Sequence, residues 1–142
     1  MDQPNAQLAL LAQLRRGVLT TLKRDGRAQL SVVSYHCDPA TALVRISTRS
    51  PLAKTANARR DPRVSLLATT EHLRPYVVAE GDAEVGPVAQ QPDDAVVEEL
   101  VEHYRTLNGE HPDWAEFRAA MVAEQRLVLR FTVTRTYGLP VG

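Results

Sequence analysis

The sequence predicts an α+β protein in which six antiparallel strands curl into a small barrel flanked by short helices. Three observations support this fold class. Short runs of β-branched and apolar residues alternate with turn sequences along the first half of the chain. Two helix-like segments are inserted before the last such run, which favours a mostly antiparallel sheet over a parallel one. The length of 142 residues suits a single domain, residues 1–142.

The strands are expected where apolar and β-branched residues alternate between turn signals. Asp25-Gly26 favours a two-residue hairpin turn, Asp38-Pro39 supplies the next turn, and the first three strands are therefore expected to form a β-meander. Gly81, inside a long run, is expected to mark a bulge. The six strands are predicted over residues 18–23, 28–37, 42–48, 63–69, 76–85 and 126–138.

Helices are expected from apolar spacing and from start and stop signals. Ser50-Pro51 is a helix-start signature, because serine accepts a hydrogen bond from a free backbone N–H and proline suits the first turn. An acidic beginning and one apolar face indicate a longer amphipathic helix, which Gly109 ends. Four helices are predicted over residues 5–14, 51–60, 92–107 and 112–125.

Composition argues against several classes of protein. The 17 basic and 17 acidic residues give a formal net charge of zero, whereas general nucleic-acid binders usually carry a basic excess. Cys37 is the single cysteine, so neither an internal disulfide nor a cysteine-based zinc site is possible. No apolar run approaches the ~20 residues that span a bilayer, and no secretory leader is recognisable. A cytoplasmic protein without nucleic-acid or membrane partners is expected.

The histidines do not form a recognisable catalytic or metal-binding pattern. His36 and Cys37 are consecutive in a predicted strand and therefore point to opposite faces, which disfavours a shared site. His103 and His111 are expected at the surface. No HExxH, CxxC or GxSxG motif occurs, so hydrolytic and zinc chemistry are disfavoured and no metal site is predicted.

Aromatic residues cluster in the later part of the chain. The spacing of Tyr104, Trp114 and Phe117 is helical, so these side chains are expected in the core or at a subunit interface rather than in a base-stacking platform. Tyr76 opens a predicted strand and is a candidate for the mouth of a cleft.

Charge is distributed unevenly along the chain. Residues 45–63 carry five arginines and one lysine against a single aspartate, whereas residues 80–102 carry eight acidic residues and no basic one. Such asymmetry suggests one surface suited to an anion and a separate acidic helix surface. The basic segment lacks the glycines of a Walker-type loop. From the residues alone it is either a solvated helix or an anion site.

Helical periodicity separates two sides of this basic segment. Leu52, Ala56 and the stem of Arg59 fall on a side that is expected to pack, while Lys54 and Asn57 fall on a side that is expected to bind. Ser47 and Thr48 end the preceding strand. Under the anion-site interpretation, their hydroxyls, free backbone N–H groups and Lys54 converge on one phosphate.

A family resemblance covers nearly the whole chain. The run from Gly17 to Leu67, which contains DGRAQLS and SPLAKTANARRDPR, is followed by VAEG and the late RTYGLP. This order resembles the pyridoxamine-phosphate-oxidase-like split-barrel proteins, and most of all their actinobacterial branch of flavin and deazaflavin oxidoreductases that use coenzyme F420. The resemblance implies a homodimer of six-stranded split β-barrels with two cofactor sites in clefts between the subunits.

The resemblance also implies which residues hold the cofactor, a 5-deazaflavin with ribityl, phosphodiester and oligoglutamate portions. Such a long polyanion gives the basic segment a physical use, with Lys54 on the phosphate and nearby arginines available to the tail. Hydride passes directly from the reduced deazaflavin, so no catalytic residue is assigned. The implied cofactor-binding residues are Gln29, Ser31, Ser47, Thr48, Arg49, Lys54, Asn57, Arg60 and Tyr76.

Two departures from the family pattern concern this site. Leu52 stands where close relatives often carry a second basic residue, and Arg74-Pro75 stand where an aromatic residue is common. The expected function is transfer of hydride from reduced coenzyme F420 to a small electron-poor organic acceptor. Two alternatives stay open, namely an FMN-binding enzyme similar to pyridoxamine-phosphate oxidase and a non-catalytic F420 carrier.

Overall fold

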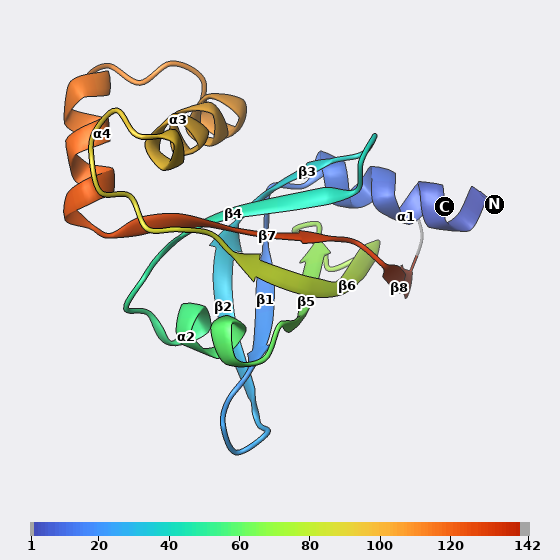
Figure 1. The fold of residues 1–142 in the computed structure, drawn as a ribbon. Coiled ribbons are helices and arrows are strands. Elements are labelled where there is room, and N and C mark those ends of the chain that lie inside the picture. The colour runs from blue at the N-terminus through green and yellow to red at the C-terminus, as the bar shows by residue number, and fades with distance from the viewer. Residues whose placement is uncertain (1, 140–142) are drawn as a thin grey trace.

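The structure is a computed structural model and describes residues 2–139, with side chains described from residue 6 onward. The ends of the predicted 1–142 domain, and Pro140 of the RTYGLP motif, lie outside this range. Figure 1 shows a curled sheet, with α2 below it and the pair α3 and α4 at one side. The helices are α1 (Asp2–Gln13), α2 (Ala53–Arg60), α3 (Ala95–Asn108) and α4 (Trp114–Ala123). The strands are β1 (Arg16–Leu22), β2 (Ala28–Ser34), β3 (His36–Asp38), β4 (Leu43–Arg49), β5 (Arg63–Thr69), β6 (Tyr76–Val85), β7 (Arg126–Thr132) and β8 (Arg135–Leu139).

All strand pairs in the described sheet are antiparallel, in the order β2-β1-β5-β6-β7-β4-β3, with β8 pairing β6. The two ends of this path, β2 and β3, are separated in sequence only by Tyr35. The sheet must therefore curl until its ends meet, which gives a half-barrel. The predicted α+β fold with a curled antiparallel sheet is confirmed, and helices are present in all four predicted places.

Two of the six predicted strands are each broken, so the described chain contains eight strands. The predicted strand 28–37 breaks at Tyr35, whose backbone N–H donates to the carbonyl of Arg15 at 2.9 Å and whose hydroxyl donates to the carbonyl of Leu11 at 2.6 Å. Both neighbour pairings of the predicted β-meander are present, since β2 pairs with β1 and β3 pairs with β4. They lie at opposite ends of the sheet path, however, so the three strands do not form one continuous meander.

The second break lies opposite Gly81. β6 pairs with β5 in unbroken register through Gly81, so the predicted bulge within β6 is wrong. On its other edge, β6 faces β7 and β8, and the pairs that flank the break are Ala83–Phe131 and Glu80–Arg135. Two residues of β6, 81 and 82, lie between these pairs, opposite three residues of the other chain segment, 132–134. The bulge therefore belongs to the chain between β7 and β8. A Cβ at Gly81 would lie 2.4 Å from the Thr132 carbonyl oxygen, so glycine permits this close approach.

Two local predictions about turns and caps also need correction. The β1–β2 hairpin has a three-residue loop, because Lys23 N–H donates to Arg27 at 2.8 Å and Gly26 adopts a φ of 87°. The N-cap of α2 is Leu52, without a side-chain cap, and the Ser50 hydroxyl instead accepts from Arg59 at 3.1 Å. The backbone N–H of Ser50 donates to the carbonyl of Gln125, which lies outside the helix.

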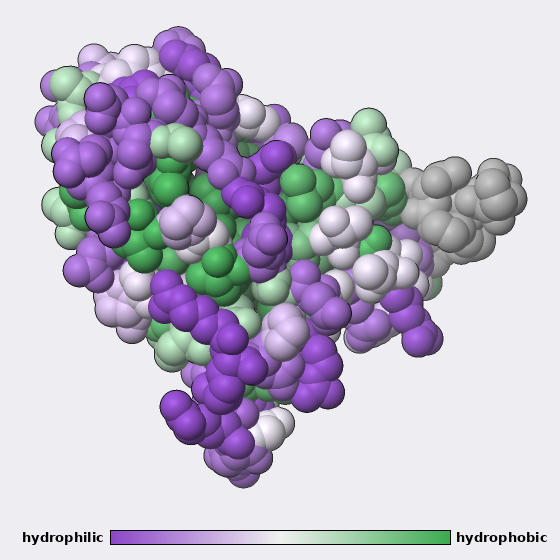
Figure 2. All heavy atoms as spheres, in the orientation of Figure 1, coloured by the Kyte–Doolittle hydropathy of each residue, from purple (hydrophilic) through white to green (hydrophobic). Residues whose placement is uncertain are grey.

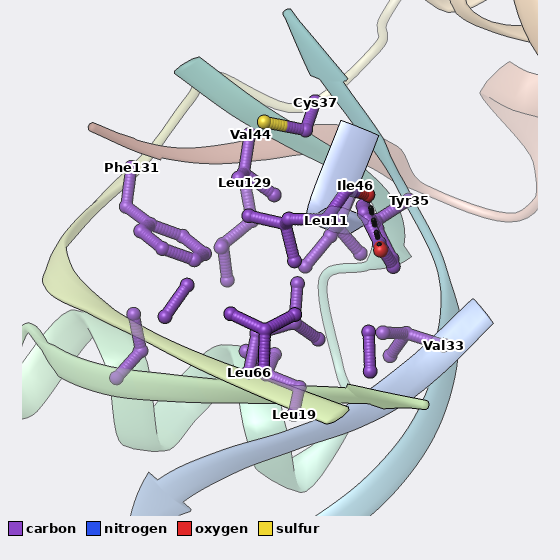
Figure 3. Close-up of a cluster of buried hydrophobic side chains, with 14 of the residues drawn as sticks. Leu11, Leu19, Val33, Tyr35, Cys37, Val44, Ile46, Leu66, Leu129 and Phe131 are labelled. Atoms are coloured by element: carbon purple, nitrogen blue, oxygen red, sulfur yellow. Dashed lines mark hydrogen bonds between the residues drawn. The ribbon is translucent and has the colours of Figure 1, made fainter. Parts of the chain in front are cut away.

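The main core fills the interior of the half-barrel. Figure 3 shows Leu19, Leu66, Leu129 and Phe131 pointing into this interior, with the bond from Tyr35 to Leu11 at its edge. α1 therefore closes one end of the barrel through both apolar contacts and a buried hydrogen bond.

A second apolar cluster joins α3 and α4 to β7. Its buried members are Ala89, Val97, Leu100, Val101, Phe117, Met121 and Val128. Tyr104 and Trp114 pack against it with their rings 5.8 Å apart, so the prediction that the late aromatic residues lie in a core is confirmed. None of the helices in the described range has the length and apolar character needed to cross a membrane.

Candidate functional site

A cavity of about 560 Å³ opens where the end of β4 and the start of α2 face the α3–α4 pair. Its walls also include the edge strand β2 and the beginning of β7. Figure 2 shows apolar side chains gathered at the surface between the α3–α4 region and the strands below it. The lining residues are Val32, Val33, Ser34, Ser47, Thr48, Arg49, Leu52, Lys54, Leu100, His103, Tyr104, Leu107, Asn108, Phe117, Met121, Glu124 and Arg126.

One end of this cavity is cationic. Arg49 donates to the carbonyl of Glu124 at 3.3 Å, and Arg126 donates to the Glu124 carboxylate at 2.9 Å and to the Ser47 hydroxyl at 3.5 Å. No carboxylate among residues 6–139 forms an ion pair with Lys54. Burial, and secondly the charge of Arg126, lower the pKa of Lys54. The cationic end is thus incompletely neutralised and suits an anion.

Two buried threonines fix the start of α2 to the end of β4. The Thr55 hydroxyl donates to the carbonyl of Arg49 at 2.8 Å and lies 3.1 Å from the Thr48 hydroxyl. Because the Thr55 hydroxyl donates its single proton to the backbone carbonyl of Arg49, the Thr48 hydroxyl is the donor in the bond between the two threonines. Thr48 therefore lines the cavity but holds the scaffold, with only its oxygen lone pairs left for a ligand.

The other end of the cavity is mostly apolar. Leu100, Tyr104 and Leu107 contribute one wall from α3, and Phe117 and Met121 contribute another from α4. The rings of Tyr104 and Phe117 are 5.1 Å apart in an edge-to-face arrangement. A cavity with one cationic and one aromatic end can accommodate a ligand that joins an anionic group to a flat, uncharged ring.

His103 is a residue that the sequence interpretation placed wrongly. The structure buries it, with 8% of its surface exposed, and its Nδ1 has no hydrogen-bond partner among the described residues. Burial, and secondly His36 and Arg45, lower its pKa to about 4, so the imidazole is neutral near pH 7. The sequence did contain a sign of this burial, because Leu100, His103 and Leu107 are three and four residues apart and therefore share one helix face. His111, also expected at the surface, is half-buried.

Asn57 and Arg60 face a different cavity from Lys54. This second cavity, about 490 Å³, lies between α2 and the β1–β2 hairpin. The Asn57 amide donates to the Thr21 hydroxyl at 3.2 Å and accepts from Arg60 at 3.2 Å. Arg60 also donates to the carbonyl of Leu22. Lys54 and Asn57 are therefore not brought to one site in this chain.

The predicted packing side of α2 is wrong. Ala56 and Arg59 are exposed, whereas Thr55, Asn57 and Ala58 are buried. The reason is that the polar groups of Thr55 and Asn57 find partners in the sheet, so the helix buries them together with the small Ala58.

Three further predicted site residues lie outside both cavities. Gln29 and Ser31 are half-buried on β2, where they alternate with the exposed Leu30 and Val32. Tyr76 is half-buried at the start of β6. Of the nine predicted residues, the structure brings Ser47, Thr48, Arg49 and Lys54 to the first cavity.

Metal-ligating side chains are not clustered in the described part of the chain. No group of three or more His, Cys, Asp or Glu residues there is arranged to hold a metal ion. Cys37 is buried, and burial together with Asp38 raises the pKa of its thiol to about 11.

Comparison with known proteins identifies the family. The structure is similar to the conserved hypothetical protein Rv2991 of Mycobacterium tuberculosis, with a TM-score of 0.70 and 23% identity over 94% of this chain and 81% of that one. It is similar to a protein described as an F420 reductase, with a TM-score of 0.64 and 19% identity over 91% and 94% of the two chains. It is also similar to HutZ, the heme storage protein of Vibrio cholerae, with a TM-score of 0.68 and 11% identity over 96% and 93%.

These structural similarities at low identity concern the fold. The sequence itself is matched over residues 4–139 by the family model described as pyridoxamine 5'-phosphate oxidase, which covers nearly all of the chain. This agrees with the half-barrel fold and with the order of motifs along the chain. The chain belongs to the pyridoxamine 5'-phosphate oxidase family of split-barrel proteins.

Proposed function

We propose that this protein is an oxidoreductase that transfers hydride from reduced coenzyme F420 to a small electron-poor organic acceptor. The observation that carries the proposal is a single cavity lined by Lys54, which has no ion-pair partner among residues 6–139, and by the aromatic wall of Tyr104 and Phe117. Membership of a flavin-related family and the similarity to an F420 reductase support this proposal.

The residues of the cavity suit the parts of such a cofactor. Lys54, Arg49 and Ser47 would hold the phosphodiester, because ammonium, guanidinium and hydroxyl groups all donate to phosphate oxygens. When bound, the reduced deazaflavin supplies the hydride. The protein's part is to orient the ring against the acceptor and to exclude water from it.

The second cavity extends the basic surface around α2. Lys23, Arg24 and Arg60 line it together with Asn57, and Asn57 holds Arg60 in place. We assign these cations to the oligoglutamate tail, whose carboxylates need several positive groups in succession. Under the FMN alternative, a ligand with one phosphate leaves this second group of cations without a function.

The outer face of the sheet supports a homodimer. Val32, Val18, Leu67, Val78 and Tyr137 pair across β2, β1, β5, β6 and β8, so they lie in one row on one face. Val32 is 79% exposed, Tyr137 is 48% exposed and Leu67 is 36% exposed, so three members of this row, the apolar stripe, are open to solvent. We propose that a second copy covers this apolar stripe.

Such a dimer also gives Tyr76 a place in the site. Tyr76 lies two residues from Val78 on β6 and therefore shares its face, beside the Tyr137 end of the apolar stripe. Val32, at the opposite end, lines the first cavity. Two copies packed antiparallel across the stripe would bring Tyr76 of one copy toward the cavity of the other.

Titration with coenzyme F420 and with FMN tests the proposal. Trp114, the single tryptophan, packs edge-to-face on Tyr104 and Phe117 of the cavity wall, so its fluorescence reports binding. F420 is expected to bind, and Lys54→Ala should weaken binding by about 10- to 100-fold if it removes a charge-assisted contact to phosphate. Arg27→Ala is the matched control, because exposed Arg27 carries the same charge and lines neither cavity.

Addition of acceptors to the reduced complex then separates the candidate functions. Oxidation by an enone or a quinone supports the reductase. Binding of FMN without binding of F420 would establish the FMN alternative, and F420 binding with no oxidation by any member of a broad acceptor panel would establish the carrier.

A further inference from the structure

The cationic end of the first cavity includes one carboxylate. Among the described residues that line this cavity, Glu124 alone is acidic, and an anion that binds there has its negative charge as a neighbour. We propose that Glu124 is a specificity-determining residue, which makes the cavity favour singly charged phosphodiesters over doubly charged phosphomonoesters. This inference rests on the proposed function and names the class of phosphate that its site takes.

Glu124 is connected to the cations that line the same end of the cavity. Its carboxylate accepts from Nε of Arg126 at 2.9 Å, and Arg126 also donates to the Ser47 hydroxyl at 3.5 Å. Its backbone carbonyl accepts from Arg49 at 3.3 Å. The side chains of Glu124 and Arg126 both line the cavity and are 40% and 28% exposed. A phosphate at this end therefore lies within electrostatic range of the carboxylate.

The backbone holds residue 124 in place without help from the carboxylate. Glu124 directly follows α4, and its N–H donates to the carbonyl of Ala120 at 2.8 Å. The next residue, Gln125, adopts a φ of 54°, and its carbonyl accepts from the N–H of Ser50 at 2.9 Å. The carboxylate itself bonds only to Arg126 among the described residues. A substitution that removes the negative charge of Glu124 therefore leaves the bonds of this turn in place.

The charge balance at this end is the basis for discrimination between phosphates. Glu124 offsets the charge of Arg126, while Lys54 and Arg49 have no ion-pair partner among residues 6–139. Lys54 lies close enough to Arg126 for that charge to lower its pKa, so these charges act on one small region.

The repulsion by Glu124 grows in proportion to the charge of the phosphate. A phosphomonoester carries nearly two negative charges above its second pKa of about 6, whereas a phosphodiester carries one. The carboxylate therefore disfavours the monoester about twice as strongly, in free energy, as it disfavours the diester. Discrimination of this kind depends on charge and not on the shape of the ring.

Titration of Glu124→Gln with two deazaflavin ligands tests the inference. The ligands are F420, a phosphodiester, and the 5′-phosphate of the same deazaflavin, a phosphomonoester that lacks the part of F420 beyond the phosphate. The glutamine removes the charge and keeps an oxygen that can accept from Arg126. At about pH 7.5, Glu124→Gln is expected to bind the monoester about 5- to 20-fold more tightly than the wild type does, and F420 only about 2- to 5-fold more tightly.

Glu116→Gln is the matched control. Glu116 is an exposed residue of the same helix, α4, and lines neither of the two cavities, so its substitution changes the net charge equally without changing the cationic end. This variant should bind both ligands as the wild type does. If Glu124→Gln does not fold, Glu124→Ala removes the same charge and keeps the backbone bonds of residue 124.

Three outcomes would overturn the inference. Unchanged affinities in Glu124→Gln would place the carboxylate outside the range of the phosphate. An equal gain for both ligands would show that Glu124 does not distinguish one charge from two, and weaker binding of the monoester would show that its carboxylate supports binding. Failure of the proposed function looks different, because the wild type and both variants would then bind neither ligand.

Discussion

The hydroxyl oxygens of Thr48 and Thr55 lie 3.1 Å apart in a buried position between the end of β4 and the first turn of α2. Thr55 also donates to the carbonyl of Arg49 at 2.8 Å, so one side chain satisfies two polar groups of the strand end. Lys54 precedes Thr55 in the same turn. This pair of threonines therefore determines where the cation of Lys54 stands relative to the cavity.

Replacement of Thr55 by valine should lower the free energy of unfolding by about 1 to 3 kcal/mol, because it leaves the Thr48 hydroxyl and the Arg49 carbonyl buried without their partner. Thr55→Ser should recover most of this loss. Ser50→Ala, at the residue that resembles a helix cap, should change stability by less than ~0.5 kcal/mol. Urea unfolding of the three variants measures these differences. Equal losses for Thr55→Val and Ser50→Ala would contradict the stronger role assigned to the Thr55 hydroxyl.

Most of the fold could be predicted because its signals are local. Turn residues such as Gly26 and Gly109 and the alternation of apolar residues gave the elements and the antiparallel class. The closure of the barrel could not be predicted in this way. Tyr35 fits a continuous strand pattern, and only its bonds to Leu11 and Arg15, distant in sequence, show that the strand breaks there.

The site was predicted in part, for a related reason. Ser47, Arg49 and Lys54 reach one cavity because a strand end and the following helix start are neighbours in any such fold. Helical periodicity also grouped Asn57 with Lys54. It could not show that Asn57 donates a hydrogen bond to the hydroxyl of Thr21, a residue distant in sequence, and so turns away from Lys54. His103 was missed because a histidine in an acidic helix resembles a surface residue, although its spacing from the apolar residues is that of a buried one.

Charge placed in the apolar stripe should prevent dimer formation. Val32→Glu puts a carboxylate at the 79% exposed end of the stripe, and the variant is expected to be monomeric where the wild type is dimeric. Leu73→Glu is the matched control, since Leu73 is 70% exposed but lies in the turn between β5 and β6, outside the stripe. Light scattering coupled to size-exclusion chromatography gives the masses. A wild-type monomer at micromolar concentration would refute the proposed dimer.

Binding of the anionic ligand should depend on the charge of Lys54. Burial, and secondly Arg126, lower the pKa of Lys54 below its ordinary 10.5, so the ammonium loses its proton at a lower pH than an exposed lysine does. Affinity for F420 is expected to fall as the pH rises toward 10.5, while Lys54→Arg, which keeps its charge, should show a flatter profile. Fluorescence titrations across this range measure both. Parallel profiles for the two proteins would show that Lys54 does not contact the anion.

Burial of His103 should make stability depend on pH. Its pKa falls from 6.5 in the unfolded chain to about 4 in the fold, mainly because burial disfavours the charged ring. Between these values the unfolded chain binds a proton that the folded chain does not, so the free energy of unfolding decreases as the pH falls through this window. The decrease attributable to His103 is roughly 2 to 3 kcal/mol, and above the unfolded value the full stability is present.

Urea unfolding at several pH values tests this dependence. The free energy of unfolding of the wild type should fall relative to that of His103→Leu as the pH falls from neutral toward 4, because the leucine variant has no proton to bind at this position. His72→Gln, which replaces an exposed histidine, should follow the wild type. A constant difference between wild type and His103→Leu across this range would mean that folding leaves the pKa of His103 at its ordinary value, and would contradict the effect of burial.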